Sequence, residues 1–306
     1  MSNTSETAAA MANPVELGLH QQSESRRVLR SVGKSKTATL GAIIFCAYIV
    51  IAILAPLLIS HDPNKQNLRR RLAPPIGIGQ ENAQFTYPLG NDNLGRDILS
   101  RIIVGSRISL SVAIITVILA STFGSLLGAM AGFYRGWFDN IIMRLVDIWM
   151  AFPPLLLAIV FGAVLGQGLA NLLIALVLTN WVSYSRVIRS ETLVLREQEF
   201  VQAAHALGAS NIRIVIYHIL PNVFSSILVI ATLQISTVII AEASLSFLGI
   251  TAQTSVPTWG GMLADGREFM REAWWLATFP GIAISIVVLS ANLLGDGLRD
   301  ALDPRL

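Results

Sequence analysis

Long apolar runs alternate with shorter polar connectors along this chain. Six runs occupy positions 40–59, 108–133, 141–165, 169–188, 223–250 and 275–294. Each reaches the length of about 20 residues that a helix needs to cross the hydrocarbon core of a bilayer. The connectors are too short and polar to bury separate cores. The pattern therefore predicts an all-α integral membrane protein with six transmembrane helices and no soluble domain.

Composition supports this prediction, because 53% of the 306 residues are hydrophobic and only 13% are charged. An average soluble domain has about 25% charged residues. The net charge of +3 comes without clusters of basic and aromatic residues, so no nucleic-acid partner is expected.

Motifs for enzymatic chemistry are missing from the sequence. The four histidines have no zinc-ligand spacing and Cys46 is the only cysteine, so no metal site is expected. The hydroxyl residues of the apolar runs have no histidine partner, which argues against an intramembrane enzyme and predicts no catalytic residue. Gly33-Lys34-Ser35 is similar to the end of a phosphate-binding loop, but Val28 stands where the motif needs glycine. Any ATP must therefore bind to another subunit.

Two polar segments flank the first apolar run. Residues 1–38 are expected to form a cytoplasmic tail that is partly disordered, since residues 1–24 are rich in small polar side chains. The basic residues that follow suit an anionic membrane surface, so lipid is an expected partner. Residues 60–107 are rich in proline and glycine and predict an irregular extracytoplasmic loop.

Glycine and proline mark two features inside the spans. Gly124, Gly128 and Gly132 recur every four residues, which lets another helix approach closely. The partner helix can belong to this chain or to a second subunit. Pro153-Pro154 lies near the middle of the third span and is expected to kink or interrupt it.

A polar connector at 190–222 combines several helix signals. Residues 192–207 are rich in strong helix formers, and Gly208 allows the left-handed conformation that ends a helix. Ser210 is expected to cap a second helix, and Pro221 is expected in the first turn of the fifth span. The connector therefore predicts a helix, a glycine turn and a second helix, which suits docking of another protein.

The spacing within this connector resembles a known element. Gln202-Ala203-Ala204 is followed by Gly208 and then by Leu220-Pro221. This arrangement resembles the cytoplasmic coupling loop of bacterial ABC importer permeases, with Gln202 in place of the usual glutamate. Four other segments resemble those of C-type permeases in the dipeptide, oligopeptide and nickel importer group: PLGNDNLGRD at 88–97, AEASLSFLG at 241–249, PTWGGML at 257–263 and LLGDGLRD at 293–300.

The resemblance covers about residues 25–306 and implies a type I ABC importer transmembrane domain, with the permease domain at 39–306 and its coupling loop at 190–222. It implies a pore formed with a second permease subunit, two cytoplasmic ATPase subunits that carry ATP and Mg²⁺, and an extracytoplasmic substrate-binding protein. It further implies import of di- or oligopeptides and a place in the bacterial inner membrane with both termini cytoplasmic. The residues expected to dock the ATPases are Glu199, Gln202, Ala203, Ala204, Gly208, Ala209 and Arg213.

Glu242 is a carboxylate inside the fifth span, where an unpaired charge is costly. It is a candidate for the translocation path, and a hydrogen bond to serine or backbone groups across a helix interface is the other interpretation. An ion-coupled secondary transporter is the alternative function. That class favours inverted repeats and charges near mid-membrane, whereas this chain has few such charges and no visible repeat.

Overall fold

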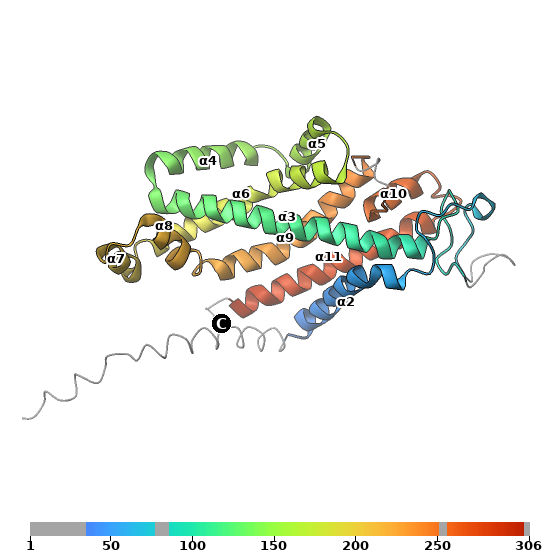
Figure 1. Ribbon diagram of the computed structural model, residues 1–306, viewed down its shortest axis with the longest axis horizontal. Helices are drawn as coiled ribbons and strands as arrows, with labels where there is room; N and C mark the ends of the chain where they lie inside the picture. Colours follow the sequence, from blue (N-terminus) through green and yellow to red (C-terminus); the bar gives the residue numbers. More distant parts are fainter. Residues whose placement is uncertain (1–34, 77–85, 251–255, 303–306) are drawn as a thin grey trace, which may run out of the picture.

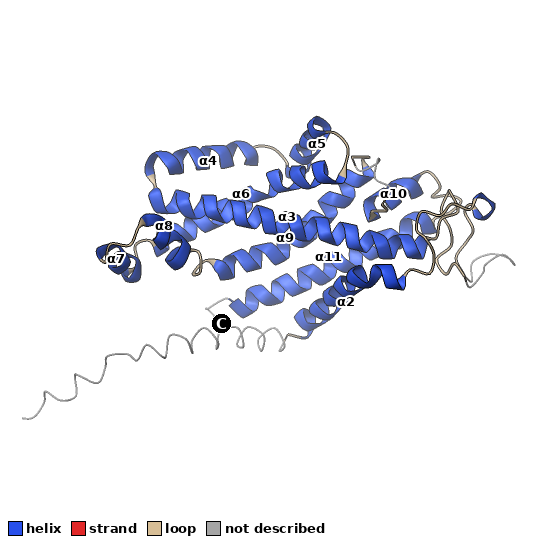
Figure 2. Ribbon diagram, in the orientation of Figure 1, coloured by secondary structure: helices blue, strands red, loops and turns tan. Residues whose placement is uncertain are grey.

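The computed structural model describes residues 35–76, 86–250 and 256–302, and most of them are helical (Figure 2). Within these ranges no β-strand occurs. The amino-terminal tail at 1–34, together with 77–85, 251–255 and 303–306, lies outside the described residues. The helices are α2 (Lys36–Leu58), η1 (Leu68–Arg70), α3 (Ile98–Tyr134), α4 (Gly136–Met150), α5 (Pro154–Leu165), α6 (Leu169–Leu195), α7 (Glu199–Ala206), α8 (Asn211–Ile214), η2 (Val215–Ile219), α9 (Phe224–Phe247), α10 (Trp259–Arg267) and α11 (Trp275–Leu302).

Five of the described helices are long and apolar enough to cross a membrane: α2, α3, α6, α9 and α11. The predicted third span is present as two helices, α4 and α5, which meet at 93°. Pro153 and Pro154 have no N–H to continue the helical ladder, and α5 starts at Pro154. The prediction of an interruption is confirmed, and six spans result if α4 and α5 together count as one.

The three spaced glycines pack against α6 of the same chain. A Cβ atom added at Gly124, Gly128 or Gly132 would lie 2.2, 2.4 or 2.7 Å from a backbone carbonyl oxygen of α6. Only glycine permits this approach, because Cβ contacts below 3.0 Å do not occur without a shift. The helix that approaches this face of α3 closely therefore belongs to the same chain and not to a second subunit.

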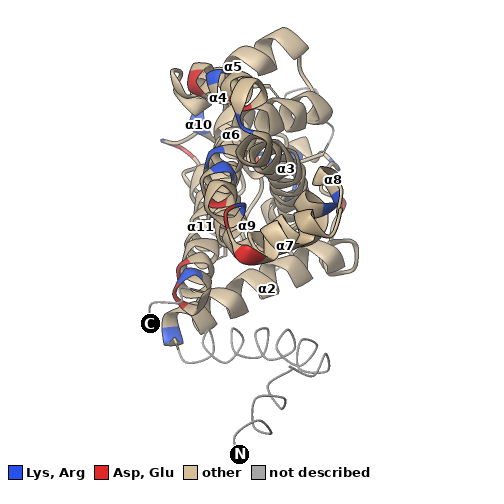
Figure 3. Ribbon diagram, turned by 90° about the vertical axis from the view of Figure 1, so that its left-hand side faces the viewer, with Lys and Arg blue, Asp and Glu red and all other residues tan. Residues whose placement is uncertain are grey.

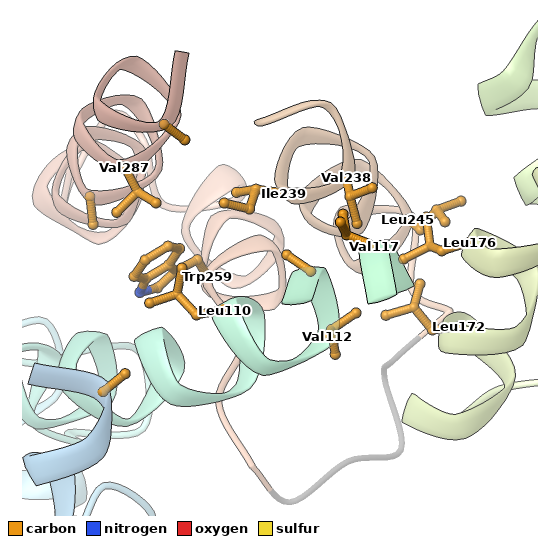
Figure 4. Packing of buried hydrophobic residues seen from close by; sticks show 14 of the residues in the cluster. Leu110, Val112, Val117, Leu172, Leu176, Val238, Ile239, Leu245, Trp259 and Val287 are labelled. Atoms are coloured by element: carbon orange, nitrogen blue, oxygen red, sulfur yellow. The ribbon is translucent and has the colours of Figure 1, made fainter. Parts of the chain in front are cut away.

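The main core lies where α3, α6, α9, α10 and α11 meet, and Figure 4 shows part of it. Val112 and Leu172 bring α3 and α6 together, while Trp259 of α10 packs near Leu110 of α3. The indole N–H of Trp259 also donates to the Ile102 carbonyl oxygen over 3.0 Å. This hydrogen bond satisfies the one polar group of a fully buried side chain.

The polar connectors gather at the two ends of the helix bundle. Figure 1 shows α7 and α8 at one end, and α10 with the α2–α3 connector at the other. At that second end, Arg96 donates to Asp92 over 2.6 Å, and the largely buried Arg101 lies 3.5 Å from Asp265 of α10. These ion pairs join the connector, the start of α3 and α10 into one unit.

Three details of the 190–222 connector differ from the sequence prediction. The expected continuous helix over 192–207 is divided, since α6 ends at Leu195 and α7 begins at Glu199. Ser210 occupies the N-cap position of α8 without a side-chain hydrogen bond to it. Pro221 lies in the turn before α9, which begins at Phe224, because the π-helical η2 and the following turn use up the intervening residues.

Candidate functional site

The connector between α6 and α9 is held to the α3–α4 turn by a small polar network. Arg196, the residue after α6, donates to the Phe133 carbonyl oxygen over 2.5 Å. Glu197 lies 3.0 Å from Arg135, which has a left-handed φ of 55° between α3 and α4. The Gln202 amide donates to the Glu197 carbonyl oxygen over 3.1 Å. The start of α7 is therefore tied to a turn more than 60 residues earlier in the chain.

Helix α7 buries one face against the membrane helices. Val201 and Ala204 are buried in an apolar cluster that includes Phe133 of α3 and Ile188 of α6. Ile214, Val215 and Ile219 extend the cluster along the second half of the connector, and Ala209 packs against it. Burial of this apolar face fixes α7 and α8 to the ends of α3 and α6.

Gly208 ends α7 as the sequence predicts, with φ of +82°. The Gly208 N–H donates to the His205 carbonyl oxygen over 3.0 Å, and the Ala209 N–H donates to the Ala204 carbonyl oxygen over 3.1 Å. This pair of bonds is the Schellman motif of helix ends. No atom lies within 4 Å of an added Cβ, so the backbone conformation, rather than close packing, requires glycine.

The opposite face of the connector is exposed and partly apolar. Gln202 and Ala203 are exposed on α7, and Leu207 beside the glycine turn is 88% exposed. Ile212 and Tyr217 continue this surface at 64% and 70%. Figure 3 views the molecule from this end, with acidic segments near α7 and basic segments near α8. Exposed apolar side chains surrounded by charges are typical of a surface that binds another protein.

The other predicted docking residues take different positions. Glu199 in the first turn of α7 and Arg213 in the last turn of α8 are exposed. Ala204 faces inward, so Ala203 is the small residue that a partner can approach. Beside α7 lies a pocket of about 460 Å³, lined in part by Arg196, Gln202 and His205.

Glu242 lies in the interior of the bundle, far in sequence from this connector. Its carboxyl group is fully buried, and Oε1 accepts a hydrogen bond of 2.8 Å from the Ser246 hydroxyl on the same helix. The Ser109 hydroxyl of α3 lies beside it. Gly260 of α10 packs directly on the backbone of Ala243, the residue that follows Glu242 in α9. In this single chain Glu242 is therefore enclosed by neighbouring helices.

Comparison with known proteins decides the family. The model of the binding-protein-dependent transport system inner membrane component matches residues 124–306, and that of the N-terminal TM domain of oligopeptide transport permease C matches residues 23–75. The chain is 45% identical to the dipeptide transport system permease protein DppC of Alkalihalophilus pseudofirmus, over 92% of this chain and 90% of the relative. It belongs to the ABC importer permeases of the DppC/OppC type.

Two further relatives of this permease are named for different solutes. It is 42% identical to the glutathione transport system permease protein GsiD of Pectobacterium atrosepticum, over 92% of this chain and 90% of the relative. It is 39% identical to a putative peptide transport system permease protein of Brucella suis, over 97% and 98%. The predicted fold class, a type I ABC importer membrane domain, is confirmed, and ion-coupled secondary transport is not favoured.

Sequence reasoning missed several residues that shape the permease connector. The polar network that holds the connector to the α3–α4 turn is formed by Arg135, Arg196 and Glu197. Among the most exposed apolar side chains of the connector are Leu207 and Tyr217. One local signal was available, since Leu207 and Tyr217 are large apolar residues within a polar segment. The polar network had no such local sequence signal, because it joins residues that are distant in sequence.

Proposed function

We propose that this permease forms the translocation pore of an ATP-driven importer for di- or oligopeptides, together with a second permease subunit. Two cytoplasmic ATPase subunits would bind ATP and Mg²⁺, and an extracytoplasmic binding protein would deliver the solute. The observation that carries the proposal is the two-sided connector at 199–219, which buries one apolar face on α3 and α6 and exposes the other. The permease itself would provide no catalytic residue.

The two faces of the connector suggest how movement caused by ATP binding would be transmitted to the pore. ATPase closure would move the exposed surface at Gln202, Ala203 and Leu207, and the buried face would carry that movement to α3 and α6. ATP can shift the pore between its states only by its different affinity for them. The connector must therefore stay bound to the ATPases in both states.

The proposal also orients the protein in the bacterial inner membrane. The end with α7 and α8 would lie in the cytoplasm with both chain termini, and the end with α10 would face the binding protein. The placement of these elements at opposite ends of the bundle supports this orientation (Figure 1). Peptide import is supported by the relatives named for dipeptide, peptide and glutathione transport.

A substitution at Gly208 tests the coupling role. Valine at a φ of +82° costs about 1–2 kcal/mol or more, so the turn between α7 and α8 must change its angle. We expect Gly208→Val to remain in the membrane and hydrolyse ATP with its partners while peptide uptake falls. Gly249→Val is the matched control, since Gly249 has a φ of +90°, is equally open, and ends α9 at the other end of the bundle.

Uptake and ATP hydrolysis are measured on the assembled complex in vesicles that contain the binding protein. Normal uptake in the Gly208→Val complex would count against the coupling role. Equal losses in both variants would show that backbone strain, rather than the connector, causes the defect. Failure of wild-type permease to copurify with ATPase subunits would refute the proposed assembly.

A further inference from the structure

Helix α6 carries a polar stripe on the face that points away from α3. Thr179, Ser183, Arg186 and Ser190 follow one another at intervals of four, three and four residues, so they share one side of the helix. Ser183, Arg186 and Ser190 are exposed, while Thr179 is partly buried. The opposite side of α6 is buried, at Trp181, Tyr184, Ser185 and Ile188 among others. The stripe is therefore an open polar surface on a membrane-spanning helix.

Arg186 lies within this helix, two residues before the end of the apolar run at 169–188. Its Cα is about 26 Å from the beginning of α6 and about 14 Å from its end at 1.5 Å per residue. Side chains on a helix lean toward its amino terminus, which directs Arg186 away from the α7 end. Its Nη1 atom lies 3.1 Å from Met150 Sδ, the last residue of α4. The guanidinium is therefore beside the break between α4 and α5.

The charge of Arg186 is not neutralised by the described part of this chain. Among the described residues, no carboxylate lies within 4.0 Å of its nitrogen atoms. By contrast, Arg189 one turn later makes two hydrogen bonds to Asp139, of 2.5 and 2.6 Å. An unpaired arginine facing lipid is costly, and such residues in membrane proteins face a water-filled path or a charged partner.

A pocket of about 400 Å³ opens beside Arg186 at the α4–α5 break. Trp149 and Phe152 provide aromatic walls, and Thr179 and Ser183 provide hydroxyl groups. Pro154 begins α5 at the rim, so the positive end of this 12-residue helix adds to the charge of Arg186. Arg186 is the one charged residue among those that line the pocket. The combination suits a small solute with a carboxylate and an apolar part.

Resting on the proposed transport function, we propose that the Thr179–Ser190 stripe lines the solute path and that Arg186 binds a carboxylate of the passing solute. A guanidinium holds a carboxylate with two charge-assisted hydrogen bonds. The exposed hydroxyl groups on either side of Arg186 can hydrogen-bond to water when the path is empty and to solute when it passes. The pocket is open on one side, so solute can enter and leave it, as transport requires.

Thiol labelling tests the path without relying on any substrate. In a Cys46→Ala background, Ser183→Cys is compared with Ile53→Cys, a 68% exposed position on the apolar helix α2. The assembled complex in membrane vesicles is treated with a charged, water-soluble methanethiosulfonate. We expect Ser183→Cys to react at least about tenfold faster, because thiols in lipid do not ionise. Equal, slow reaction at both positions would overturn the proposal.

Uptake of a dipeptide and of its carboxyl-terminal amide tests the role of Arg186. Loss of one charge-assisted contact is expected to weaken interaction about tenfold. Arg186→Gln should therefore reduce dipeptide uptake at low concentration and lower the preference over the amide, and Arg186→Lys should restore part of that preference. Arg107→Gln, an exposed arginine near the start of α3, is the control and should retain the preference.

The possible outcomes distinguish failure of the Arg186 carboxylate site from failure of the proposed transport function. If wild-type vesicles import no peptide, the proposed function fails, and the labelling still decides whether α6 lines a path. An unchanged dipeptide-to-amide ratio in Arg186→Gln would overturn the carboxylate site. Loss of the second permease subunit from this variant, together with unreactive Ser183→Cys, would assign the stripe to a subunit interface instead.

Discussion

The α3–α6 contact offers the sharpest test of the packing, through Gly128→Ala. An alanine Cβ would lie 2.4 Å from the Ser185 carbonyl oxygen and 2.9 Å from the Ser185 Cα. Both atoms are backbone, so no side-chain rotation relieves the clash. Ordinary van der Waals contact begins near 3.4 Å, so the two helices must separate by about 1 Å. Overpacking of this kind costs about 1–3 kcal/mol.

The higher helix propensity of alanine opposes this cost by up to about 1 kcal/mol in a soluble helix. Gly281→Ala in α11 isolates that gain, because the nearest atom to its added Cβ is Leu263 Cδ2 at 3.8 Å. We therefore expect Gly128→Ala to unfold more easily than wild type and Gly281→Ala to unfold no more easily. The difference between the two variants should be about 1–3 kcal/mol.

The assay is thermal unfolding of the detergent-solubilised complex, followed by the size-exclusion peak of the intact assembly. Denaturant titration of the same samples gives the free energies. If Gly128→Ala unfolds as wild type does, close backbone approach does not stabilise α3 against α6. If Gly281→Ala loses as much stability, the effect comes from glycine replacement in general.

Two other substitutions probe the connector and its support. Gln202→Glu loses the hydrogen bond to the Glu197 carbonyl but keeps an exposed polar side chain, so copurification with ATPase subunits should persist, and its loss would contradict the docking geometry. Asp139→Ala should lower the melting temperature more than the double variant Asp139→Ala/Arg189→Gln, because it leaves the guanidinium of Arg189 unpaired. Equal melting of the single and double variants would show that the ion pair is too well solvated to matter.

Features set by local backbone chemistry could be predicted from the sequence. Gly208 ends α7 at a positive φ, which the helix formers before it and the glycine itself indicate. Pro153 and Pro154 remove backbone donors wherever the chain places them, so an interruption was predictable. The angle of 93° was not, since it depends on how α5 packs against α6 and α9.

Features set by distant contacts could not be predicted. The helix expected over 192–207 is broken after Leu195, where Arg196 donates to a carbonyl oxygen of Phe133. Nothing near Arg196 in sequence specifies that partner. Ala203 and Ala204 are likewise equivalent in sequence, and only the cluster beneath α7 decides that Ala204 is buried and Ala203 exposed.

One helix connects the proposed docking surface with the proposed solute site. The buried face of α7 packs on Ile188 of α6, two positions after Arg186. The glycine contacts hold α6 and α3 together along about two helical turns, so these helices should move as one body. At the α4–α5 break, Trp149 is itself tied to α6, because its indole N–H donates to the Leu178 carbonyl oxygen over 2.8 Å. A displacement of the connector should therefore move Arg186 and Trp149 together with α6, and so move the pocket that the solute meets.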